Sequence, residues 1–184
     1  MDDGVALLHA IKSMDTEALA KLFELYAPTI YKYAFRHCGN AITADQIVGD
    51  VFEKLLEQLS QGRGPNSNVR SYLFEMAYHA MVDEIRYDRR LTSINTFAPF
   101  LTDSRFTDIT AEEQSLMDAI WQAMQCDLTP DQRQVIVLRF LEGFSLKETA
   151  AIMGKKVGNI KIIQKRAVVA LRKVLDNQAI ELLQ

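Results

Sequence analysis

Apolar residues recur along most of the chain at spacings of three and four, the pattern of one buried face of an amphipathic helix. In the first half, the pattern predicts helices over residues 19–34, 47–59 and 69–90, with Pro28 as a boundary or kink in the first. Residues 61–68 are rich in Gly, Asn and Ser and contain a proline, which predicts a loop before the third helix. The first half is therefore expected to be a small helical domain.

Capping signals mark the start of several helices. A side chain that caps a helix and a Glu or Gln three residues later form a capping box. Four such pairs occur: Thr43 with Gln46, Thr110 with Glu113, Thr129 with Gln132, and Ser145 with Glu148. They predict helices that begin near these residues, and glycines at 143 and 154 predict where the third and fourth of these helices end.

Residues 91–110 break the helical pattern, because polar residues and a proline are scattered there among phenylalanines. This segment is the best candidate for a linker. The sequence thus predicts an all-α protein with a helical domain at 1–90, a linker at 91–110 and a second helical domain at 111–184.

Composition supports the helical prediction and excludes several classes of protein. The 184 residues include only 8 Gly and 4 Pro, fewer than the many turns of an all-β protein need. Cys38 and Cys126 are too few and too far apart for a disulfide framework or a cysteine-rich zinc site. The acidic start is unlike a secretory signal, and no apolar run approaches membrane-spanning length. We expect a soluble cytoplasmic protein without membrane insertion, metal or cofactor.

The net charge of −3 hides an asymmetry. Between residues 155 and 173 the chain carries seven basic residues and no acidic one: Lys155, Lys156, Lys161, Lys165, Arg166, Arg172 and Lys173. A local cationic segment on an acidic protein can bind a polyanion while the rest of the protein repels it.

The segment from Ser145 to Leu175 has the layout of a helix-turn-helix: a capped short helix, a glycine turn and a longer basic helix. Lys161 and Lys165 lie one turn apart, where they can contact phosphates. Asn159 is near the helix start, where such proteins contact base edges, and asparagine can pair with adenine. The alternative is a solvated amphipathic helix, but the caps, turn and charge together favour DNA binding.

Here the sequence resembles a known family. Residues 128–145, 148–154 and 157–161 resemble the C-terminal domain of bacterial RNA polymerase sigma factors. Residues 44–52 look like the polymerase-binding helix of that family, and residues 70–86 look like its promoter-melting helix. The size and two-domain layout are similar to the small extracytoplasmic-function (ECF) group. The resemblance implies a sigma factor that directs RNA polymerase to promoters and assists DNA melting.

The resemblance implies a role for each part. The first domain would dock on the clamp helices of the largest polymerase subunit, and the second would meet the flap. By position, the core-binding residues would be Gln46, Gly49, Asp50 and Glu53. The last helix and the turn before it would enter the major groove of the upstream promoter element. The residues expected there are Lys155, Lys156, Asn159, Lys161, Ile162, Lys165 and Arg166.

The loop and the helix after it would capture an unpaired base of the downstream promoter element. A polar loop beside aromatic residues is also, on physical grounds alone, a plausible stacking platform for single-stranded DNA. The expected residues are Arg63, Asn66, Ser67, Asn68, Arg70, Tyr72, Arg86, Arg89 and Arg90.

Other functions remain possible from the sequence. A stand-alone helix-turn-helix regulator would bind DNA without polymerase, and a degenerate sigma-like protein would act as an interaction module. An enzyme lacks support, because no nucleophile, phosphate loop or metal-binding set is visible. The resemblance also implies an inhibitory anti-sigma partner.

Overall fold

The computed structural model describes residues 3–91 and 120–181, with side chains over 7–83 and 120–173. The chain divides into two compact units, Met1–Asn95 and Thr96–Gln184. All regular structure in the described residues is helical, which confirms the all-α prediction. The linker expected at 91–110 and the capping box of Thr110 and Glu113 lie almost entirely outside these residues, so the domain boundaries stay predictions. No helix among those described is long and apolar enough to cross a membrane.

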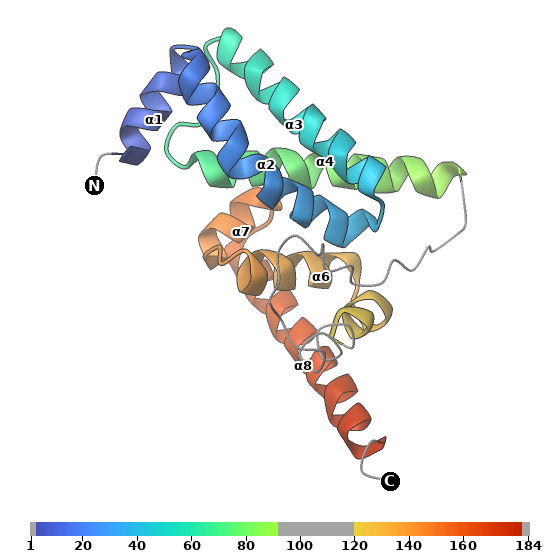
Figure 1. The fold of residues 1–184 in the computed structure, drawn as a ribbon. Coiled ribbons are helices and arrows are strands. Elements are labelled where there is room, and N and C mark those ends of the chain that lie inside the picture. The colour runs from blue at the N-terminus through green and yellow to red at the C-terminus, as the bar shows by residue number, and fades with distance from the viewer. Residues whose placement is uncertain (1–2, 92–119, 182–184) are drawn as a thin grey trace. The chain divides into compact units, whose positions relative to one another are not determined.

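The first unit contains four helices in the described residues (Figure 1). They are α1 (Asp3–Lys12), α2 (Thr16–Cys38), α3 (Ala41–Ser60) and α4 (Val69–Leu91). The helices α2, α3 and α4 pack against one another, and α1 packs on α2. The largest fully buried side chains of this core are Ile11, Leu22, Ile30, Tyr33, Leu55, Leu73, Phe74 and Met81.

Two details of the first unit correct the sequence-based expectations. α2 continues through Pro28 rather than ending there. Pro28 is exposed, so water can bind the Glu24 carbonyl group that loses its helical donor. The cap of α3 is Asn40, not Thr43, because the Asn40 side chain accepts hydrogen bonds from the N–H groups of Ile42 and Thr43. Thr43 therefore already lies in the first turn.

The second unit begins, as described, with helical residues 120–127. Three α-helices follow: α6 (Pro130–Ile136), α7 (Leu146–Ile152) and α8 (Val157–Glu181). α8 packs against both α6 and α7 (Figure 1). Trp121 is 5% exposed and belongs to this core.

Two of the three capping boxes predicted in the second unit are confirmed, and the third lies outside the described residues. Thr129 and Gln132 exchange hydrogen bonds at the start of α6, and Ser145 and Glu148 do so at the start of α7. The helical segment after Thr129 ends at Leu141, as expected, but its last part is a π-helix, η1 (Val137–Leu141).

Candidate nucleic-acid interface

The turn of the helix-turn-helix lies between α7 and α8. Gly154 adopts a left-handed conformation with φ of 61°, a conformation that favours glycine. The N–H of Lys155 donates to the carbonyl of Ala150 at 2.9 Å, and the N–H of Gly154 donates to that of Ala151 at 3.1 Å. Ala150 is buried. The turn and the small residue beside it therefore set where α8 begins.

One face of α8 packs into the core of the second unit. Ile160 and Ala167 are fully buried there, and Ile163 and Leu171 are half-buried. This arrangement agrees with the apolar spacing in the sequence. It fixes which side chains on the rest of the helix face solvent.

The opposite face of α8 and the end of the turn carry the residues expected to meet DNA. All of the following are exposed: Lys156, Asn159, Lys161, Ile162, Lys165 and Arg166. Lys161 and Lys165 are one helical turn apart, a spacing that allows both to reach neighbouring phosphates. The structure therefore presents a cationic surface with an amide and an aliphatic side chain within it.

Lys155 differs from these residues because it is engaged within the protein. Its Nζ atom lies 3.0 Å from Oδ2 of Asp131, and the two side chains are 30% and 49% exposed. Asp131 lies in the first turn of α6. This pairing could not be predicted from the sequence, since the two residues are far apart along the chain.

Arg139 of η1 links α8 to the residue that precedes the α7 cap, a role that the sequence does not predict. Its Nε donates to Oε1 of Gln164 on α8 at 3.2 Å, and its Nη1 donates to the carbonyl oxygen of Phe144. Phe144 directly precedes Ser145, the cap of α7. The only signal for it is a lone arginine between the apolar residues Leu138 and Phe140.

Arg133 was also missed, and it closes the end of helical residues 120–127. Its Nε and one Nη atom donate to the carbonyl groups of Met124 and Gln125 at 3.1 and 3.0 Å. Burial lowers the pKa of the Arg133 guanidinium, and the nearby Cys126 thiol partly opposes this shift. The side chain supplies donors for carbonyls that the helix itself leaves without partners.

In the first unit, residues 61–68 form the predicted loop between α3 and α4. Arg63, Asn66 and Ser67 are exposed, and Oδ1 of Asn66 accepts a hydrogen bond from Lys12 Nζ at 3.4 Å. Asn68 instead caps α4, because its Oδ1 accepts from the N–H of Ser71 at 3.0 Å. A base contact by Asn68 would have to coexist with this cap.

Arg70 and Tyr72 follow the loop on α4 and are half-buried. The guanidinium carbon of Arg70 lies 5.1 Å from the ring centroid of Phe74. Burial, with a smaller effect from Glu75, raises the pKa of Tyr72, so the phenol is neutral near pH 7. Phe74 and Tyr78 are buried and belong to the core.

Three arginines expected at the same surface, Arg86, Arg89 and Arg90, lie on the last part of α4. Their side chains fall outside the described residues. Their contacts with DNA therefore stay a prediction.

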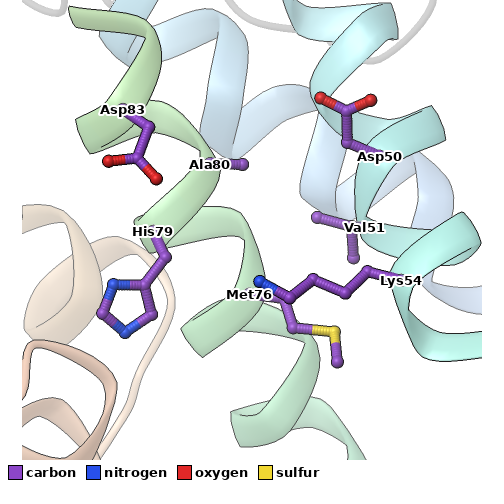
Figure 2. A pocket seen from close by; sticks show the side chains of 7 residues that line it. All are labelled: Asp50, Val51, Lys54, Met76, His79, Ala80 and Asp83. Carbon is purple, nitrogen blue, oxygen red and sulfur yellow. The ribbon is translucent and has the colours of Figure 1, made fainter. Parts of the chain in front are cut away.

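The residues expected to bind polymerase share one exposed stripe of α3, at positions 46, 49, 50 and 53. Asp50 also borders a hollow between α3 and α4 (Figure 2). The hollow is lined by Asp50, Val51, Lys54, Met76, His79, Ala80 and Asp83. Lys54 extends across it towards α4, whereas His79 points away from α3 (Figure 2). The position of Asp83 of α4 at this rim was not foreseen from the sequence.

Comparisons with known proteins identify both units. Residues 22–91 match the family model "Sigma-70 region 2", and residues 127–173 match "Sigma-70, region 4". Together the two matches cover more than half of the chain.

Individual relatives are also named as ECF RNA polymerase sigma factors. The chain is 27% identical over 177 residues to the ECF RNA polymerase sigma factor BldN of Streptomyces coelicolor, covering 94% of this chain and 66% of BldN. It is 26% identical to the ECF RNA polymerase sigma factor SigX of Bacillus subtilis, covering 87% of this chain and 84% of SigX. A similar fold occurs in the sigma factor RpoE of Bartonella quintana, solved with the anti-sigma factor NepR. That match has a TM-score of 0.69 and 21% identity, and it covers 85% of this chain and 96% of RpoE.

Proposed function

Since the chain belongs to the sigma-70 family, in the ECF group of bacterial RNA polymerase sigma factors, we propose that it directs RNA polymerase to specific promoters and assists DNA melting. The observation that carries this proposal is the presence of both family regions in one chain, in order. Support also comes from the exposed residues of α3 at 46, 49, 50 and 53 and of α8 at 159, 161, 162, 165 and 166. This combination favours a sigma factor over a stand-alone regulator, because a regulator that binds DNA without polymerase does not need the first region.

The first unit binds the polymerase core through α3. Gln46, Gly49, Asp50 and Glu53 lie on one exposed stripe, and an acidic stripe suits a basic partner surface. The expected partner is the pair of clamp helices on the largest subunit. Phe140 and Leu141, at the end of η1, are 57% and 41% exposed and offer an apolar contact for the flap.

The loop and the start of α4 capture single-stranded DNA of the downstream element. Arg63, Asn66 and Ser67 are free of the core, and Tyr72 offers an uncharged ring for stacking. Arg86, Arg89 and Arg90, on the last part of α4, are also expected to contact this DNA.

The second unit binds the upstream element with α8 in the major groove. Asn159 lies near the helix start, where base edges are within reach, and the cations at 161, 165 and 166 face outwards to phosphates. The acidic first unit repels DNA, so the free protein is expected to bind promoters weakly and to depend on polymerase for tight binding.

The protein acts in the cytoplasm as a binding factor and performs no covalent chemistry. An anti-sigma partner would inhibit it by covering surfaces that polymerase needs. The complex of RpoE with NepR supports this class of partner by likeness of fold alone. Exposed apolar side chains on the first unit, such as Phe23 at 49% and Ile42 at 71%, offer contact area for a protein partner.

Co-elution with purified core RNA polymerase on a size-exclusion column tests the proposal. The full-length protein should co-elute, and Asp50→Arg should not, because it reverses a charge in the middle of the α3 stripe. Asp127→Arg is the matched control: it makes the same charge change at an exposed residue of the second unit and should still co-elute.

Circular dichroism of each variant establishes that it is folded. If the folded native protein does not bind core polymerase, the sigma-factor proposal is wrong. Tight, specific duplex binding by the protein alone would then favour the stand-alone regulator.

A further inference from the structure

Ile162 is an aliphatic side chain at the centre of the cationic face of α8. It is 52% exposed, whereas Ile160 on the opposite face is fully buried. With about 100° of rotation per residue, Asn159 and Arg166 lie on one side of Ile162 and Lys165 lies on the other. About half of the Ile162 surface is therefore open to a bound partner.

Gly158 lies one turn before Ile162 on the same face. A Cβ atom at Gly158 would meet no atom within 4 Å, so core packing does not require a glycine here. Helical side chains lean towards the helix N-terminus, so Ile162 leans over the turn that contains Gly158. Because Gly158 has no side chain, the surface beside Ile162 is recessed, and a bound duplex can approach Ile162 closely.

We propose that Ile162 reads the C5-methyl group of a thymine in the major groove of the upstream promoter element. The proposal rests on the proposed function, because it requires α8 to lie in that groove. Thymine is the only base that presents a methyl group there. Contact between this methyl and Ile162 buries apolar surface from both partners. A polar base edge at the same place would lose water without gaining a hydrogen bond.

The test uses the full-length protein assembled with core RNA polymerase. Promoters are first selected from a library randomised in the upstream element. Each thymine of a selected element is then replaced by deoxyuridine, which removes only the methyl group. At one position, this change should weaken binding by the native holoenzyme roughly threefold to fivefold, the effect expected for one buried apolar carbon group.

Ile162→Ala should abolish the effect, so that the thymine and uracil promoters bind equally well at that position. Val169→Ala is the matched control. Val169 is 61% exposed and lies two turns further along the same face, beyond the helix start that reads bases. This variant should keep the full preference for thymine.

Two failures are distinguishable. If no holoenzyme forms, or no upstream sequence is enriched, the proposed function is wrong. The inference that Ile162 contacts a thymine methyl group is then wrong as well. If promoters are enriched but no uracil substitution weakens binding, the inference alone is overturned. The same holds if Ile162→Ala retains the native sensitivity to uracil.

Discussion

The ammonium group of Lys155 and the carboxylate of Asp131 lie 3.0 Å apart, which joins the turn of the helix-turn-helix to the first turn of α6. Lys155 is also one of the cations expected at the upstream DNA. Asp131 and a DNA phosphate would therefore compete for the same ammonium group. Which partner prevails determines how much Lys155 contributes to promoter binding.

Asp131→Asn should release Lys155 and strengthen promoter binding. The exposed ion pair and the favourable charge at the start of α6 together stabilise the fold by only about 1 kcal/mol, so the variant should remain folded. A released Lys155 can add one phosphate contact. The log–log salt slope of holoenzyme binding should then steepen by up to about one unit. Fluorescence anisotropy with a promoter fragment at several KCl concentrations measures this slope.

Asp127→Asn is the control, because it removes the same charge from a nearby exposed residue that is not the partner of Lys155. Its slope should match that of the native protein. Equal slopes for Asp131→Asn and Asp127→Asn would show that Lys155 makes no additional phosphate contact when it is released.

Thr149→Val should stabilise the second unit. Thr149 is fully buried on α7, and its Oγ1 has no hydrogen-bond partner among the described residues. Replacing the hydroxyl by a methyl group of similar shape removes the cost of burying it, and we expect a gain of about 1 kcal/mol in the free energy of unfolding. Urea unfolding followed by the fluorescence of Trp121, the only tryptophan of the chain, measures this unit.

Thr149→Ser provides the comparison, since it keeps the hydroxyl and removes the methyl group. It should lower the free energy of unfolding by roughly 1 kcal/mol through lost apolar contact. A lower urea midpoint for Thr149→Val than for the native protein would instead indicate that the hydroxyl binds a buried water molecule.

Gly64→Ala should destabilise the first unit and impair DNA melting. Gly64 has φ of 147°, and a Cβ there would lie 2.9 Å from Cδ2 of the buried Leu59. The substitution therefore combines backbone strain with displacement of a core side chain, and we expect a loss of roughly 2–3 kcal/mol. Thermal unfolding by circular dichroism measures the stability, and permanganate reactivity of unpaired thymines measures promoter melting.

Gly62→Ala separates the two causes. Gly62 also has a positive φ, of 69°, but a Cβ there would meet open space. The cost should be only the left-handed strain of about 1–2 kcal/mol. If both variants lose the same stability, the contact with Leu59 has no energetic importance.

The sequence was sufficient to predict features that depend on local chemistry. The caps Thr129 and Ser145 act within one helical turn, so residue type and spacing reveal them directly. Thr43 and Gln46 have the spacing of a capping box, which predicts that Thr43 caps α3. Asn40, directly after the left-handed Gly39, takes that role and begins the helix three residues earlier.

Features that depend on tertiary contacts could not be predicted from the sequence. Nothing near Lys155 in the sequence indicates Asp131, and nothing near Arg139 indicates Gln164. The π-helical η1 was also missed, since an apolar pattern along a short segment does not distinguish a hydrogen bond to the fourth residue from one to the fifth. The periodicity of the buried faces of α3 and α8 indicates which residues face solvent, whereas what those residues bind stays a prediction.

Arg139 and Gln164 should be coupled in the stability of the second unit. Arg139→Met removes the hydrogen bonds to Gln164 and to the Phe144 carbonyl, and it should cost about 2–3 kcal/mol, since each bond has a charged donor. Gln164→Leu removes only the first and should cost about 1 kcal/mol. The double variant, measured by urea unfolding with Trp121 fluorescence, should lose at least about 0.5 kcal/mol less than the sum of the single losses. Strict additivity would mean that the bond between them does not help to hold α8 against η1.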